Sequence, residues 1–501
     1  MAVNAVPIEE TIAFREPLTP GHANALGTAI REHYLVPRIV GPAASNYRTW
    51  QDPRAGQTEF YFEVDITAPS RPGGTPERVP VNIHLIISTR NVRVLFTSEV
   101  PIDDTHRAIL RLIADDIREF VAEFLERARR SAVHVVLDPY PPAPGTLSGT
   151  SRQGNQTIRK VFTGNSTNLF LIILLFTFPL ILFIGVYAIV LMIAVQAFVL
   201  FYSDRLALRM GSVRPSADRP KAAVLGVALP EGPGAPTSRQ VGRRVPALRV
   251  RLEETLAGGD VADKAFRAKA LDTLHQSGIN CSEEDLEFTV RDVYGLVQRA
   301  AQRFALPMPK VVLSDNPVSN AAATGISPRR ATMLITAGSL EELDDAQLEA
   351  VIGHELGHIR GRDPVILLAS SAVLYLGGIF VWPAVLFYLG IWYFVLALAL
   401  VYLFGKVLET RADTYSATVL GSPKELASAL TTIAFAELYL ERRSISARFF
   451  RWLTLDSHPP VYFRIERLLR MAAGKEPVRS PFWSSARDCL AGFFGAVVGR
   501  A

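Results

Sequence analysis

The chain has 501 residues, of which 49% are hydrophobic, and its mean hydropathy is +0.20. This average is too apolar for a typical soluble enzyme, and the excess lies in two long runs, which indicates a membrane protein. The net charge is +5, and the only two cysteines, Cys281 and Cys489, imply no disulfide framework. The N-terminus lacks the apolar core of a secretory signal peptide, so we expect the soluble part to be cytoplasmic.

Residues 1–137 are predicted to form a small soluble α+β domain of unknown role. Apolar and polar residues alternate as in β-strands in three segments: 57–68, 79–88 and 91–100. Apolar residues recur at helical spacing over 102–130, and the composition of 133–137 is typical of another short strand. Proline, glycine and serine are then frequent, so we interpret 138–167 as a linker.

The first apolar run, 168–202, contains no charged residue. It is long for one membrane helix and short for two, since about 20 apolar residues span a bilayer. Pro179 and Gly185 near its middle permit a break. Both flanks are basic, which favours a tight hairpin with both ends in the cytoplasm. A single tilted span is the alternative, and it would place the N-terminal domain outside.

The segment 203–290 is predicted to be a basic linker and insert. From Gly211 to Arg251 there are eight Lys and Arg residues, two acidic residues and six prolines. This composition is typical of a poorly structured segment near anionic lipid headgroups. A nucleic-acid-binding patch is the alternative, but no aromatic residues are interleaved with the basic ones, so we expect no nucleic-acid partner.

The pattern His-Glu-x-x-His at 354–358 is the strongest chemical signal in the chain. Asp344 and Gln347 form a candidate capping box ahead of it, so we expect the pattern on a helix. His354 and His358 would then project from one face and bind one zinc ion, while Glu355 could reach a water on that metal. Zinc lowers the pKa of such a water to about 7, and a carboxylate can take its proton for attack on a peptide carbonyl. A chance match on an amphipathic helix is the alternative.

The second apolar run, 365–405, is long enough for two spans. Its middle, 377–383, has the glycines, proline and tryptophan expected of a tight hairpin tip. Two arginines precede the run, and Lys406 and Arg411 follow it, so we expect both ends in the cytoplasm. The hairpin would divide the catalytic region into two parts on the same side of the membrane: 291–364 and 406–501.

Glu409 is the candidate for the third metal ligand that such a site needs. Glu409 and Asp413 would share one helix face, one turn apart. Glu409 could then bind the metal while Asp413 accepts the free ring N–H of a ligand histidine. An ordinary solvated charge cluster is the alternative. A pair of spans before Glu409 favours the metal site, because it returns the chain to the side of His354 and His358.

Five segments occur in the order found in one known family. They are FYSDRLALRMGS, LPMPKVVLSDNPVSNAAATG, LEAVIGHELGHIRGRD, ETRAD and DSHPPVYFRIERL. Together they make the chain resemble the HtpX-like integral-membrane zinc metallopeptidases, relatives of the CAAX prenyl endopeptidases. The resemblance covers about 169–210 and 290–470. It implies a mainly α-helical, membrane-embedded, gluzincin-type metalloprotease with a small edge-strand sheet, here joined to an N-terminal soluble α+β domain.

The resemblance also implies roles for individual residues in the catalytic step. His354, His358 and Glu409 would be the ligands of one catalytic Zn²⁺, and Glu355 would be the general base. His458 would lie near the scissile bond, where a second donor can stabilise the developing oxyanion. For His458 the alternative is a loop histidine fixed by the two prolines that follow it.

Further roles concern residues around the metal. By the same resemblance, Asp413 would be the partner of a ligand histidine, and Arg464 would support the site from behind the ligands. Asn320 and Ala321 would lie by the edge strand, which pairs with an extended substrate backbone.

The function implied by the resemblance is that of a zinc-dependent endopeptidase acting on membrane or membrane-associated proteins, in protein quality control. The enzyme would be integral to the cell inner (plasma) membrane with its site facing the cytoplasm, and its partners would be polypeptide substrates and the lipid bilayer. A dedicated processing protease for a prenylated or membrane-bound substrate is one alternative. A membrane-bound regulatory protein with a latent protease fold is another, although the intact set of candidate ligands and base argues against it.

Overall fold

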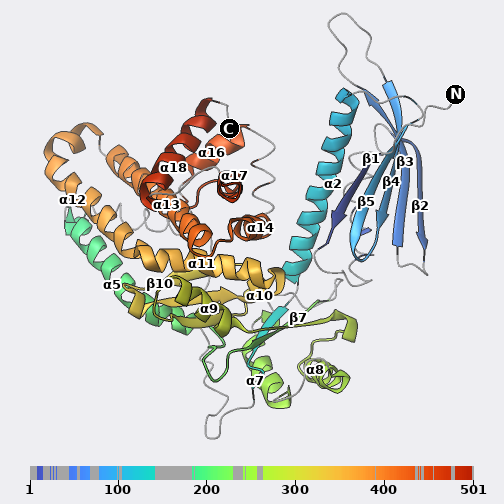
Figure 1. Ribbon diagram of the computed structural model, residues 1–501, viewed down its shortest axis with the longest axis horizontal. Helices are drawn as coiled ribbons and strands as arrows, with labels where there is room; N and C mark the ends of the chain where they lie inside the picture. Colours follow the sequence, from blue (N-terminus) through green and yellow to red (C-terminus); the bar gives the residue numbers. More distant parts are fainter. Residues whose placement is uncertain are drawn as a thin grey trace, which may run out of the picture. The chain divides into compact units, whose positions relative to one another are not determined.

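The computed structural model is mostly helical, with three β-sheets in the part that it describes (Figure 1). The structure describes residues 8–14, 44–52, 57–67, 78–140, 183–229, 241–256, 263–434, 445–474 and 480–498, except 99, 101–103, 132, 186, 243, 390 and 455, together with isolated positions between 23 and 30 and at 438 and 441. The chain divides into two compact units, Met1–Ser131 and Ala132–Ala501. The predicted linker 138–167 lies mostly outside the described residues.

The first unit combines an antiparallel five-stranded sheet with one long helix, α2 (Asp104–Ser131). Its strands, in the spatial order β1-β5-β4-β3-β2, are β1 (Ile8–Ala13), β5 (Asn91–Thr97), β4 (Arg78–Ile87), β3 (Gln57–Thr67) and β2 (Ala44–Asp52). One face of β4, including Ile83 and Leu85, forms a core with Leu110 and Ile117 of α2, because alternate residues of a strand point to the same face. The three predicted strands and the predicted helix are therefore present.

The strand predicted at the end of the N-terminal domain belongs to the second unit instead. β6 (Val133–Leu137) pairs antiparallel with β7 (Ala222–Val227), which pairs antiparallel with β8 (Leu286–Arg291). Every residue of β6 and β7 is buried. The predicted boundary at residue 137 is therefore one strand too late, because the apolar strand finds its partner about 90 residues further along the chain.

The segment 203–290 is folded where the structure describes it. Helices α7 (Val245–Leu256) and α8 (Lys264–Gln276) share a buried cluster with β6 and β7 that includes Leu225 and Leu252. Arg249 is only 2% exposed; its Nε donates to the Val136 carbonyl at 3.0 Å. The expectation of a poorly structured basic segment was wrong here, because apolar residues between the basic ones build a strand and a helix.

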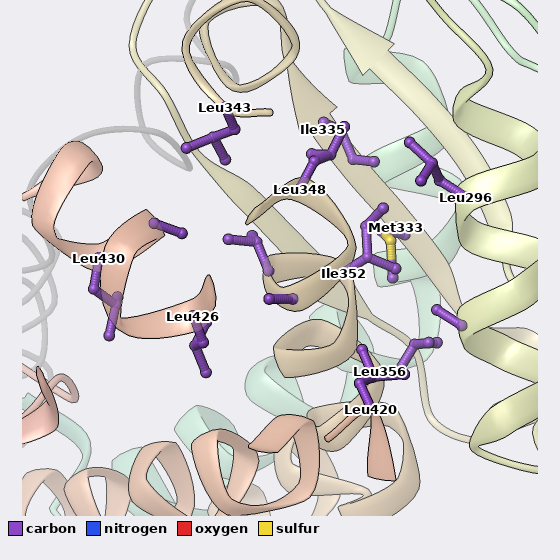
Figure 2. Close-up of a cluster of buried hydrophobic side chains, with 14 of the residues drawn as sticks. Leu296, Met333, Ile335, Leu343, Leu348, Ile352, Leu356, Leu420, Leu426 and Leu430 are labelled. Atoms are coloured by element: carbon purple, nitrogen blue, oxygen red, sulfur yellow. The ribbon is translucent and has the colours of Figure 1, made fainter. Parts of the chain in front are cut away.

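A second small sheet lies beside the candidate zinc helix. Its strands are β9 (Lys310–Ser314), β10 (Ala321–Thr324) and β11 (Thr332–Thr336). β11 is central, pairing parallel with β9 and antiparallel with β10, so β10 is an edge strand. Helices α9 (Val293–Arg303), α10 (Ala337–Glu342) and α11 (Asp345–Gly361) share its core. Figure 2 shows the side chains of this core around α11, among them Leu296, Met333, Ile335, Leu348, Ile352 and Leu356.

Three long apolar helices pack together at one end of the second unit: α5 (Tyr187–Met210), α12 (Asp363–Leu389) and α13 (Ile391–Val419). Ile189, Tyr375 and Ala397, one from each helix, form a small buried cluster. Among the described residues, α5 is the one helix that is long and apolar enough to cross a membrane, and only 17% of its most apolar window is buried. Its start follows Gly185, whose φ of 60° breaks the apolar run.

The predicted hairpin tip at 377–383 was wrong. These residues lie inside α12, which ends at Leu389, and α13 begins at Ile391. Glycine and proline are tolerated inside long apolar helices, so their presence alone does not fix a turn.

Among the described residues after α13, the second unit has four shorter helices: α14 (Pro423–Ile433), α16 (Ile445–Leu453), α17 (Val461–Ala472) and α18 (Pro481–Val498). They extend the main core through Trp452, Phe463 and Leu468. The loop between α16 and α17 passes closely over α13, since a Cβ added at Gly405 would lie 3.1 Å from the Cβ of Ser457.

Candidate metal centre and active site

Helix α11 holds the two histidines inside the protein. The predicted capping box is confirmed: the Gln347 N–H donates to Asp344 at 2.8 Å, and the Asp344 N–H donates to the Gln347 side chain at 3.1 Å. The helix stops at Gly361 because Arg362 adopts a left-handed backbone, with φ 52°. His354 and Glu355 are each only 7% exposed.

Two glycines allow α13 to approach α11 closely. A Cβ at Gly357 would lie 3.0 Å from the Cα of Ala412, and a Cβ at Gly353 would lie 2.3 Å from the Cδ1 of Leu420. A side chain at Gly357 would press on the backbone of α13, and one at Gly353 would require the side chains of Leu420 and Ser416 to move. The close approach brings Glu409 of α13 to the histidines of α11.

Three ligand-type atoms converge between these helices. The Nε2 atoms of His354 and His358 are 3.2 Å apart. Glu409 Oε2 lies 3.3 Å from His354 Nε2, and Glu409 Oε1 lies 3.3 Å from His358 Nε2. These residues are the one such metal-ligand group of His, Cys, Asp or Glu among the described residues.

Each histidine has a carboxylate behind it. His354 Nδ1 lies 2.8 Å from Asp413 Oδ1, and His358 Nδ1 forms a 2.8 Å hydrogen bond with Asp363 Oδ2. An imidazole that donates from Nδ1 carries a lone pair on Nε2. When the ring is neutral, Nε2 can therefore serve as a metal ligand.

Buried arginines hold these two carboxylates. Arg464 donates twice to Asp413, at 2.7 and 2.8 Å, and Arg411 pairs with Asp363. Burial by itself would raise the pKa of Asp413, but Arg464 holds that pKa well below its usual value. Asp413 therefore stays a carboxylate, with its negative charge beside His354 Nδ1.

The donor set and its spacing fit a zinc ion. Glu409 Oε2 is buried and has no hydrogen-bond partner. Two neutral imidazoles and a carboxylate this close together need a positive charge between them, either protons on the histidines or a metal ion. Ligand atoms 2.0–2.1 Å from a tetrahedral zinc ion would be separated by about 3.3 Å, which is the separation found here.

The electrostatics of the cluster also favour a cation. Burial would lower the pKa of His358, but the charge of Glu409 and the bond to Asp363 raise that pKa well above its usual value. Burial would raise the pKa of Glu409, but His458 and His358 hold it well below. The carboxylates thus draw positive charge to the histidines, and protons must leave before a metal ion binds.

Comparison with known proteins gives the family. Residues 289–472 match the family described as Peptidase family M48. A protein named Protease HtpX homolog from Acaryochloris marina is 31% identical over 216 residues, which are 36% of this chain and 71% of that protein. A protein of the same name from Thermodesulfovibrio yellowstonii is 30% identical, and the match covers 38% of this chain and 79% of that protein. Another, from Thermococcus kodakarensis, is 31% identical, and the match covers 37% of this chain and 75% of that protein. This chain is an HtpX-like M48 peptidase.

In this M48 peptidase, Glu355 follows the first histidine on α11. Its carboxylate is close enough for its charge to act on His358 and Arg464. His458 approaches the cluster from the loop before α17, with its Nε2 3.7 Å from Glu409 Oε2. Its side chain is 56% exposed, so it faces open space on the side away from Glu409.

The loop that carries His458 is fixed from two sides. Asp456 accepts from the backbone N–H of His458 at 3.0 Å and lies 2.9 Å from its Nδ1. Lys406, buried in α13, donates to the carbonyl of Thr454 at 3.1 Å and to that of Asp456. Lys406 was expected as a basic residue flanking the apolar run. It instead points inward from α13 and holds this loop.

The structure places Asn320 and Ala321 at the start of the edge strand β10. The Asn320 carbonyl accepts from the Thr336 N–H at 3.1 Å and from the Ser339 hydroxyl at 2.9 Å, and Asn320 itself is exposed. Ala321 is paired with Ile335 of the central strand. The edge strand contacts α11, the helix of the two histidines.

Two further carboxylates that orient the histidines escaped the sequence analysis. Asp363 follows His358 by five residues, across the left-handed Arg362, where helical spacing no longer predicts contact. Asp456 precedes His458 by two residues in a loop. Arg411 offered a signal for Asp363. It lies two residues from Glu409 on the same helix, and a buried arginine needs an acidic partner, which here is Asp363.

Proposed function

We propose that this HtpX-like M48 peptidase is a zinc-dependent endopeptidase embedded in the inner (plasma) membrane, which cleaves membrane or membrane-associated proteins at the cytoplasmic face. The observation that carries the proposal is the convergence of His354, His358 and Glu409 as mutually facing ligand-type side chains at separations of 3.2 and 3.3 Å. Two imidazoles and one carboxylate are a donor set of catalytic zinc sites, which keep a fourth position for water or substrate.

The surrounding residues supply the proton and charge chemistry of peptide hydrolysis. A bound zinc ion would polarise the scissile carbonyl and acidify water. Glu355 would take the proton from the attacking water and pass it to the leaving amine. His458 would donate to the oxygen of the tetrahedral intermediate, a role that its open side chain beside Glu409 permits.

Substrate would bind as an added strand. β10 is the edge of its sheet and contacts α11, so an extended peptide paired with β10 would pass the histidines. Asn320 and Ala321 would contribute at the start of that strand. Main-chain pairing of this kind accepts many sequences, which suits a protease for misfolded proteins in quality control.

The apolar helices support a membrane location. α5 leaves most of its apolar window exposed, and Val373 of α12 and Leu396 of α13 are 70% and 60% exposed. Outward-facing apolar side chains on three packed helices suit lipid better than water. In this proposal α12 and α13 would be two spans that return α11 and Glu409 to one side, and 168–202 would be a hairpin broken at Gly185.

A dedicated processing protease for one prenylated or membrane-bound substrate would use the same site. It would differ from a quality-control protease in cutting that one substrate and not unfolded proteins in general. A latent protease fold would bind but not cut. Purified protein in detergent should contain one zinc per chain and digest casein, and a chelator should abolish digestion until zinc is restored. Zinc-replete protein that cuts no unfolded substrate would support the latent fold and contradict the proposal.

A further inference from the structure

Helix α18 exposes large apolar side chains along one side, where a helix on the surface of a soluble protein usually exposes polar ones. Trp483, Arg487, Leu490 and Phe494 recur at helical spacing on one stripe, and this stripe is exposed. The three apolar members are 72%, 49% and 60% exposed. We call these four residues the α18 stripe. The helix lies beyond the region that matches the M48 family, which ends at residue 472.

The rest of α18 packs against the protein through Phe482 and Phe493 and, between them, through small and polar residues. Ser485 lies 3.3 Å from Thr414, and the Sγ of Cys489 lies 3.0 Å from the hydroxyl of Thr410. Asp488 accepts from Arg467 at 2.9 Å. Gly492 allows the aromatic rings of α16 and α17 to approach, since a Cβ there would lie 2.8 Å from Phe463 and 2.9 Å from Trp452. Small and polar residues inward with large apolar residues outward suit a lipid-facing helix.

The position of α18 along α13 matches the edge of the bilayer. Its contacts with α13 run from Phe404, at the end of the apolar run 365–405, to Thr410 and Thr414 beyond that run (Figure 1). The rings of Phe404 and Phe482 are 6.2 Å apart. α18 therefore lies at the level where α13 would leave the membrane.

Helix α16 extends the same outward apolar surface. Phe450 and Leu453 are 64% and 50% exposed. Phe493 of α18 packs 6.5 Å from Phe449 and 6.3 Å from Trp452, ring to ring, so the two helices are neighbours. Both of these neighbouring helices therefore carry exposed apolar side chains.

We propose that the α18 stripe, with Phe450 and Leu453, is immersed in the headgroup region of the cytoplasmic leaflet as an interfacial membrane contact. This inference rests on the proposed membrane location of the enzyme. It adds a lipid contact outside the apolar runs 168–202 and 365–405. It would fix the height and tilt of the catalytic part over the bilayer, because α18 is packed on the helix that carries Glu409.

The composition of the stripe favours lipid at the interface over a transmembrane position. Tryptophan is enriched at the membrane–water boundary, and an arginine among apolar residues can reach anionic headgroups. Arg487 and Asp488 lie near the middle of an 18-residue helix, where they would be costly at the bilayer centre. A second copy of this chain is the competing occupant of the surface.

Depth-dependent quenching tests the proposal on the full-length protein. Single cysteines replace Leu490 or Phe494 in a Cys281→Ser/Cys489→Ala background, carry an environment-sensitive fluorophore, and are reconstituted into vesicles of neutral and anionic phospholipid. We expect blue-shifted emission. Lipids that carry a quencher near the headgroup should quench it strongly, and lipids that carry a quencher deep in the acyl chain should quench it less. The same label at Glu284→Cys, an exposed residue outside the apolar helices, should be quenched by neither.

A label at Leu400→Cys on α13 separates the two proposals. Quenching at position 400 by the deep quencher without quenching at 490 and 494 would overturn the interfacial contact alone. No quenching at any of the three positions would overturn the membrane location as well. Blue-shifted emission at 490 and 494 without lipid quenching would assign the surface to a second copy of the chain and reject the lipid contact.

Discussion

The chemistry of the site depends on which nitrogen of each histidine carries its proton. Asp413 and Asp363 lie at the Nδ1 atoms of His354 and His358, and this leaves both Nε2 atoms facing Glu409, where they can bind a metal ion once they lose their protons. Each carboxylate is in turn held by a buried arginine. At the scale of single residues, metal binding should therefore be as sensitive to these partners as to the ligands.

Asp363→Asn should weaken zinc binding by about 10- to 100-fold, because the neutral amide is a poorer partner for the ring N–H of His358. Competition with a chromogenic chelator would measure the zinc affinity, and thermal unfolding would show that the fold persists. Asp345→Asn is the matched control, since Asp345 is the first residue of α11 as Asp363 is of α12, but it is exposed and pairs with Arg291. Equal zinc affinity in Asp363→Asn and the control would remove Asp363 from the site.

His458→Ala should retain zinc and fold but lower the turnover rate by about 10²- to 10³-fold, because the lost hydrogen bond is made mainly in the transition state. KM should change little for the same reason. Steady-state kinetics on a peptide substrate, with zinc content measured on the same sample, would test this. A near-normal turnover rate in the zinc-replete variant would leave His458 as a loop residue.

Residues with regular spacing were predictable and residues in irregular segments were not. His354 and His358, and likewise Glu409 and Asp413, are four apart on helices, so their shared faces follow from geometry alone. Asp363 and Asp456 reach the histidines across a left-handed residue and a loop, where no periodicity exists. That the two helices meet depends on Gly353 and Gly357, whose role only the packing reveals.

At the scale of elements, hydrophobic pattern predicted which segments form strands and helices but not which partners they choose. The strand at 133–137 was predicted, yet it pairs with β7 rather than with the N-terminal sheet. Basic residues suggested a disordered segment over 211–251, yet apolar residues between them build β7 and α7. Glycine and proline suggested a turn at 377–383, yet α12 continues through them.

Membrane topology gives a prediction for the two apolar runs. If each is a hairpin, Cys281 and a cysteine introduced at Pro142 should both be shielded from a membrane-impermeant thiol reagent in intact cells. Both should become labelled when the membrane is permeabilised. Labelling of the Pro142 position alone in intact cells would show that 168–202 crosses once and that the N-terminal unit faces outward.

At the scale of the whole molecule, the family match covers 289–472 while the chain begins and ends well outside it. The N-terminal unit has its own core, and none of its described residues belongs to the metal cluster. The insert packs its own core on β6 and β7 beside the catalytic sheet. All three residues of the metal cluster lie on α11 and α13. Two substitutions on these helices in the full-length protein can therefore test whether the cluster is a catalytic zinc site.

That test compares the zinc content and proteolysis of Glu409→Gln and Glu355→Gln in detergent. Glu409→Gln should lose most bound zinc, because it removes a charged ligand from the three-residue cluster. Glu355→Gln should retain zinc at the wild-type level and lose casein digestion, because only a proton acceptor is removed. Equal zinc content in wild type and Glu409→Gln, or active proteolysis in Glu355→Gln, would contradict the account.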